Sequence, residues 1–127
     1  MLKELIKQFK KFCEMCEGSY KDSVFPMCVK YSFRISLEYL EREDYLEYLL
    51  VKIVSEEGDE EILRIRNVKI LDVKRISEND ESGVLRYYTL LVKTSNGTLY
   101  LRRDIKEKKL IVQFESPNIS YKSIVLF

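Results

Sequence analysis

Histidine, tryptophan and alanine are absent from this chain of 127 residues. Without histidine, Ser-His-Asp triads, Cys-His dyads and histidine-ligated metal sites are excluded, because each of them requires an imidazole. The chain has only four glycines, and it contains no nucleotide-binding or nucleophile-elbow motif. The sequence therefore predicts that the protein is not an enzyme and that it holds no cofactor or metal.

Long apolar runs are missing as well, since no stretch approaches the roughly 18 residues of a membrane-spanning helix. The start, Met1–Glu4, is charged and lacks a small-residue cleavage site, so no signal peptide is expected. These features predict a cytoplasmic protein without membrane contact. Many lysines and glutamates with only two glutamines are typical of thermophiles, which predicts a thermophilic archaeon, or its virus or plasmid, as the source.

The overall composition is that of a globular protein, with 46% hydrophobic and 34% charged residues. A chain of this length usually forms one domain with its own core, so residues 1–127 are expected to be a single domain. The formal net charge of +1 is too low for a strong nonspecific nucleic-acid binder. Residues 37–61, called the acidic segment below, carry ten acidic and only two basic side chains.

Residues 1–17 predict an amphipathic helix, because apolar residues recur there at spacings of three and four. Gly18 stands where a helix C-cap is expected, and a loop is expected from Ser19 to Pro26. The apolar positions are Leu2, Leu5, Ile6, Phe9, Phe12, Cys13 and Cys16.

Residues 29–127 change to the period of two that is typical of strands, most clearly in Val29–Leu37. Ile62–Ile76 is expected to form one long strand or two short ones, with a bulge near Asn67. The stretch 38–50 is ambiguous between helix and strand, and two strands joined by a turn are favoured. The predicted fold is α+β, with an N-terminal amphipathic helix packed on a curved antiparallel meander sheet or partial barrel of about seven strands.

Asn96-Gly97 predicts a two-residue hairpin turn, which would place Thr94 opposite Leu99. One face of this hairpin would point to the core and carry Leu90, Val92, Leu99 and Leu101. The other face would carry Tyr87, Lys93, Tyr100 and Arg102. Aromatic rings beside cations can stack bases and neutralise phosphates. An ordinary solvent-facing sheet is the favoured interpretation of this face, with a protein-binding face and a nucleic-acid-binding face as alternatives.

Cys13 and Cys16 form a C-x-x-C motif, and Cys28 follows. The motif falls at the C-terminal end of the predicted helix, which is the wrong end to stabilise a thiolate. A zinc site would lack a thiolate or imidazole as its fourth ligand. The favoured interpretation is that these cysteines are small core residues. A disulfide between Cys28 and one of the helix thiols is the main alternative, ahead of a metal site or a catalytic thiol.

Two further segments carry hypotheses about partners. The acidic segment could dock a basic partner, imitate nucleic acid or bind a divalent cation, but a solvated face that pairs with cations such as Arg64 and Arg66 is favoured. The last strand is expected to run from Ile119 to Phe127, and its end, Ser123–Phe127, is apolar on both faces. This strand therefore either lies centrally between others or leaves an apolar edge. An uncovered apolar edge invites pairing with a second copy, so a homodimer is expected.

Taken together, the sequence predicts a small non-enzymatic binding protein. Its partner would be another protein, met through a sheet face or the acidic segment. A nucleic-acid-binding module that uses the Tyr/Lys/Arg face of the hairpin is the alternative function. A thiol- or metal-dependent activity at the C-x-x-C motif is a weaker alternative.

Overall fold

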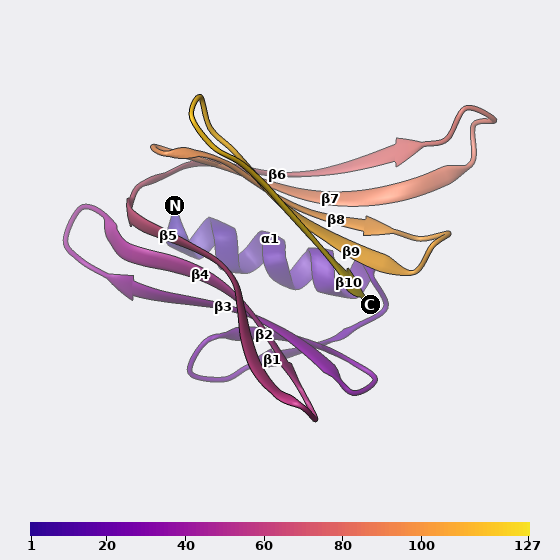
Figure 1. Ribbon diagram of the computed structural model, residues 1–127, viewed down its shortest axis with the longest axis horizontal. Helices are drawn as coiled ribbons and strands as arrows, with labels where there is room; N and C mark the ends of the chain where they lie inside the picture. Colours follow the sequence, from indigo (N-terminus) through magenta and orange to yellow (C-terminus); the bar gives the residue numbers. More distant parts are fainter.

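A computed structural model describes all residues, 1–127, and shows one helix held between two antiparallel sheets (Figure 1). Sheet A has the strand order β1-β2-β3-β4-β5, and sheet B has the order β10-β9-β8-β7-β6. Both orders follow the chain, so the fold is an α+β meander. The elements are α1 (Leu2–Met15), β1 (Ser19–Asp22), β2 (Pro26–Lys30), β3 (Phe33–Glu41), β4 (Leu46–Ser55), β5 (Gly58–Val68), β6 (Ile70–Asn79), β7 (Leu85–Thr94), β8 (Gly97–Asp104), β9 (Lys109–Glu115) and β10 (Ser120–Leu126).

The predicted single sheet of about seven strands is replaced by two sheets of five strands each. β1 lies in the stretch expected to be a loop. The alternating run Val29–Leu37 is divided by a tight turn at Tyr31 and Ser32, where Tyr31 adopts a φ of 55° without the glycine or asparagine that normally marks such a turn. The ambiguous stretch 38–50 forms strands, as favoured, and its turn connects β3 to β4.

A break at Lys69 divides the run Ile62–Ile76 into β5 and β6 and thereby separates the two sheets. The backbone bends near the expected position, since Asn67 adopts a φ of 49°. The β7–β8 turn is hydrogen-bonded to this bend between β5 and β6. The Ser95 backbone N–H donates to the Lys69 carbonyl at 2.9 Å, and Asn96 Nδ2 donates to the Arg66 carbonyl at 2.8 Å.

The β7–β8 hairpin differs from its predicted register by two residues, because Thr94 pairs with Gly97 and Val92 with Leu99. Thr94 Oγ1 accepts hydrogen bonds from the Asn96 and Gly97 backbone N–H groups, both at 3.2 Å. The two turn residues are therefore Ser95 and Asn96 instead of the predicted Asn96 and Gly97. Gly97 has a φ of 155°, and a Cβ there would lie 2.5 Å from the Glu115 carbonyl oxygen. A shift of two residues preserves the faces, so the four residues predicted for the core are all buried.

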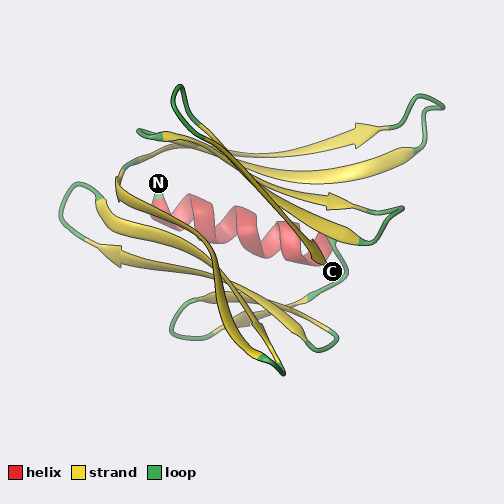
Figure 2. Cartoon of the chain, viewed as in Figure 1, coloured by secondary structure: helices red, strands yellow, loops and turns green.

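Helix α1 fills the space between the sheets (Figure 2) and completes one cluster of 25 buried hydrophobic residues. Its buried positions are Leu5, Phe9, Phe12 and Cys13. Along its edge, Arg75 Nε of β6 donates to Gln8 Oε1 at 2.6 Å. With 14 residues and a charged outer face, α1 is neither long nor apolar enough to span a membrane.

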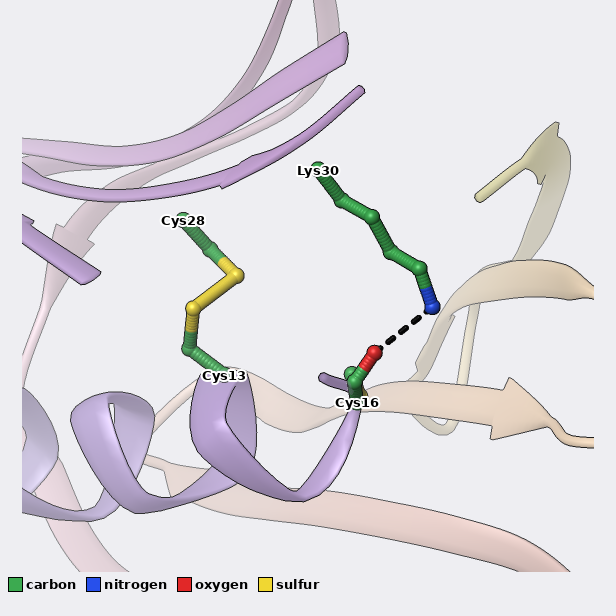
Figure 3. Close-up of a disulfide and its surroundings, with 4 residues drawn as sticks. All are labelled: Cys13, Cys16, Cys28 and Lys30. Carbon is green, nitrogen blue, oxygen red and sulfur yellow. Dashed lines mark hydrogen bonds between the residues drawn. A yellow bond between two sulfur atoms is a disulfide. The ribbon is translucent and has the colours of Figure 1, made fainter. Parts of the chain in front are cut away.

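A disulfide between Cys13 and Cys28 joins the end of α1 to β2, with the two Cα atoms 5.6 Å apart (Figure 3). Gly18 packs directly on this disulfide, since a Cβ there would lie 2.6 Å from Cys28 Sγ and 3.0 Å from Cys13 Sγ. Glycine is therefore required at position 18 for space. Cys16 keeps a free, buried thiol.

The disulfide predicts a measurable loss of stability in a Cys28→Ser variant. A cross-link between residues 15 apart restricts the unfolded chain and is worth ~3 kcal/mol. We expect the free energy of unfolding, measured by urea denaturation, to fall by about that amount. Reductant should destabilise the wild type to the same extent and leave Cys28→Ser unchanged. A wild type that is equally stable with and without reductant would contradict the cross-link.

Candidate functional sites

The outer face of sheet B carries the four residues predicted for nucleic-acid binding, and it faces away from α1. Tyr87 and Lys93 lie on β7, and Tyr100 and Arg102 lie on β8. The structure brings Tyr87 and Arg102 together, with the guanidinium carbon 3.8 Å from the ring centroid. Tyr100 pairs with Leu91, and Lys93, which is exposed, pairs with Thr98 nearer the turn.

The cations around Tyr87 are already paired with carboxylates. Arg102 Nη2 lies 3.0 Å from Glu78 Oε2. The guanidinium of Arg86 also lies against the Tyr87 ring, at 5.2 Å, and it donates to both carboxylate oxygens of Asp104 at 3.3 and 3.1 Å. The positive charges of Arg86 and Arg102 are therefore neutralised within the sheet, and of the four predicted residues only the exposed Lys93 keeps an unpaired positive charge for a phosphate backbone.

Asp104 is a structural anchor of this network and is only 1% exposed. Its Oδ1 also accepts the backbone N–H groups of Lys106 and Glu107, both at 3.1 Å, which shapes the β8–β9 turn. Burial alone would raise the pKa of the carboxyl group, but the hydrogen bonds from Arg86 and from the two N–H groups outweigh burial and hold the pKa below its ordinary value.

The acidic segment does not form one continuous acidic surface. Lys52 pairs with both Glu38 (3.3 Å) and Asp59 (2.8 Å), and Glu47 and Glu61 also have arginine partners. Unpaired carboxylates gather instead at the β3–β4 turn and at the β4–β5 turn. These turns lie at opposite ends of β4, whose ten residues span roughly 33 Å.

The three cysteines do not form a metal or thiol site. No group of three or more metal-ligating side chains is placed to hold an ion. Two of the cysteines are consumed by the disulfide. Burial raises the pKa of the Cys16 thiol to about 12, so this thiol stays protonated and is a poor nucleophile at neutral pH.

Strand β10 lies at the edge of sheet B and pairs only with β9. The outward side chains in its N-terminal half are Ser120 and Lys122, and those in its C-terminal half are Ile124 and Leu126, which are 55% and 69% exposed. Ile124 pairs with Ile111 of β9, so the apolar surface extends from the edge onto the outer face of the sheet.

Two inward-facing cations were not singled out from the sequence. On β8, Arg103 follows the buried Leu99 and Leu101 at alternate positions and is itself only 5% exposed. On β2 of the opposite sheet, Lys30 follows the buried Pro26 and Cys28 in the same way. The available signal was the alternation itself, because a cation in phase with core leucines must point inward. Both residues line a pocket beside the end of α1.

The chain matches no known protein family, and no curated protein or solved structure shows significant similarity to it. Its function must therefore be argued from the geometry of these sites.

The Asp104 network predicts a specific pH dependence of stability. A carboxyl group whose pKa is depressed by folding stabilises the folded state above its unfolded pKa of about 3.9, and this contribution is lost as the pH falls through the lower folded pKa. We expect Asp104→Asn to be less stable at neutral pH and to show a flatter acid limb in urea denaturation.

The matched control for this prediction is Glu78→Gln, which removes an exposed ion pair on the same face and should change stability little. An Asp104→Asn variant with the same acid limb as the wild type would contradict the assigned role.

Proposed function

We propose that the protein is a non-enzymatic binding protein that meets a protein partner along the free edge of β10. The observation that carries this proposal is an edge strand whose C-terminal half exposes two apolar side chains, Ile124 and Leu126. An edge strand presents unpaired backbone N–H and C=O groups, which can hydrogen-bond to a strand of another chain. The exposed Ile124 and Leu126 would then be covered by the partner.

The other three sheet edges support this choice by contrast. β1 is only four residues long, and its edge carries Lys21 and Asp22. The outer edge of β5 is rich in charged side chains, and β6 carries Lys74, Arg75 and Glu78. Short strands and charged side chains are the usual protection against strand addition. β10 carries a single charge, Lys122, and is the least protected edge.

The simplest partner is a second copy of this chain. Two β10 strands that pair antiparallel about a two-fold axis would join two copies of sheet B into one ten-stranded sheet. Such pairing buries the same apolar patch on both copies, which accounts for Ile124 and Leu126 without a further component.

Nucleic acid has less support as the partner, because Arg86 and Arg102 are already neutralised by Asp104 and Glu78. The acidic segment likewise has less support as a docking surface, because its unpaired carboxylates are divided between two distant turns. Both remain predictions from the sequence.

Light scattering coupled to gel filtration at micromolar concentration tests the proposal. We expect the wild type to elute with twice the mass of one chain, and Ile124→Lys to elute as a monomer, since a lysine there places like charges together at the pairing edge.

The matched control is Val84→Lys, which puts the same charge on an equally exposed apolar residue, 61% against 55%, in the β6–β7 connection. This control should remain dimeric. A monomeric wild type, or equal dissociation of both variants, would refute the pairing of β10 with a second copy.

A further inference from the structure

A pocket of about 540 Å³ opens between the two sheets beside the C-terminal end of α1. Its volume lies in the range of small-molecule sites. The reason for the space is geometric. Helix α1, with 14 residues, is roughly 21 Å long, whereas the ten-residue strands β4 and β7 span roughly 33 Å. One helix therefore cannot fill the full length of the gap between the sheets.

Arg103 brings a buried positive charge to this pocket without an anionic partner. Its Nη1 donates to the backbone carbonyls of Asp104 at 2.6 Å and Lys109 at 3.5 Å. It takes part in none of the ion pairs of the chain, and its other nitrogens have no hydrogen-bond partner within the protein. A guanidinium that is 5% exposed and lacks a carboxylate would gain a charge-assisted partner from an anion that enters the pocket.

Lys30 enters the same pocket from the opposite sheet and reaches past the end of α1 (Figure 3). Its Nζ donates to the Cys16 carbonyl at 2.7 Å and lies 5.8 Å from the Phe127 ring centroid. Burial, and then the nearby charge of Arg103, lower the pKa of Lys30. Both cations line the same pocket, and an anion between them would offset their like charges.

Most of the remaining lining is apolar. Phe33, Tyr88, Ile105 and Phe127 line it from both sheets. Glu17 and Glu107 also line it, but both side chains are exposed and neither forms an ion pair with Arg103 or Lys30. The buried charge is thus that of Arg103, beside the half-buried Lys30, while the acidic residues and Lys108 of the lining are exposed.

We propose that this pocket binds an amphipathic organic carboxylate, whose head group lies between Arg103 and Lys30 and whose apolar body packs on the aromatic lining. The planar fork of an arginine matches a carboxylate with two parallel hydrogen bonds, and the nitrogens of Arg103 that have no partner are available for them. The apolar walls select against a small inorganic anion, which would leave them uncovered.

Isothermal titration calorimetry on the full chain tests the proposal with three probes. Decanoate carries both head and tail, acetate carries the head alone, and decanol carries the tail alone. We expect saturable binding of decanoate, with acetate and decanol at least tenfold weaker. Decanoate that shows no saturable binding, or decanol that binds as tightly as decanoate, would overturn the proposal.

Two neighbouring arginines provide a matched pair of variants. Arg103→Gln should weaken decanoate binding at least tenfold, whereas Arg102→Gln, on the opposite face of the same strand, should stay within twofold of the wild type. Equal effects of both variants would refute the role of Arg103. If Arg103→Gln fails to fold, Lys30→Gln replaces it, and an unchanged affinity in Lys30→Gln would refute the site.

The two proposals share one residue, because Leu126 of β10 lines the pocket, but Ile124 does not. Ile124→Lys should therefore bind decanoate like the wild type, whatever its oligomeric state. Loss of decanoate binding in Ile124→Lys would contradict the assignment of the ligand to this pocket.

Discussion

The burial of one amphipathic helix on both sides by a single meander is the constraint on which the structure depends. A flat sheet could cover only one side of α1. The second side of the helix is covered because the meander breaks between β5 and β6 at Lys69, and the last five strands form a second sheet over the helix. The β7–β8 turn then bonds to this bend through Ser95 and Asn96. The hydrophobic core, the positions of both sheets' edges and the pocket at the helix end all result from this bend.

Periodicity in the sequence was sufficient for the helix and for the core face of the β7–β8 hairpin. The period of three and four identified α1, and alternation identified Leu90, Val92, Leu99 and Leu101 as buried. A local signal near Asn67 also pointed to the bend. The sequence leaves one long strand or two short ones open over Ile62–Ile76, because nothing local distinguishes a bulge within one sheet from a break between two sheets. Only the long-range contact with the β7–β8 turn decides between them.

The alternation of apolar and polar residues also gave a wrong prediction where a turn interrupts a strand without interrupting the alternation. The run Val29–Leu37 alternates through the β2–β3 turn, and Tyr31, which continues the apolar pattern, is 89% exposed at the turn. In β2 the inward positions are Pro26, Cys28 and Lys30, which is the opposite phase to that of the sequence pattern. Because of this wrong phase, the sequence pattern does not predict that Lys30 points inward and contributes to the pocket. The inward direction of Arg103 could be predicted from the sequence, because Arg103 continues the alternation of the buried Leu99 and Leu101.

The two proposed sites follow from different consequences of the same architecture. A meander that does not close into a barrel leaves edges, and three of its four edges are short or rich in charge whereas β10 carries one charge and exposes Ile124 and Leu126. A helix shorter than the strands around it leaves space between the sheets, and that space would normally be closed by hydrophobic side chains. The chain instead directs a lysine and an arginine into it from opposite sheets. Both cations donate to backbone carbonyls, Lys30 at the C-terminal end of α1 where a positive charge is favourable, and the proposed carboxylate would add the anionic partner that Arg103 lacks.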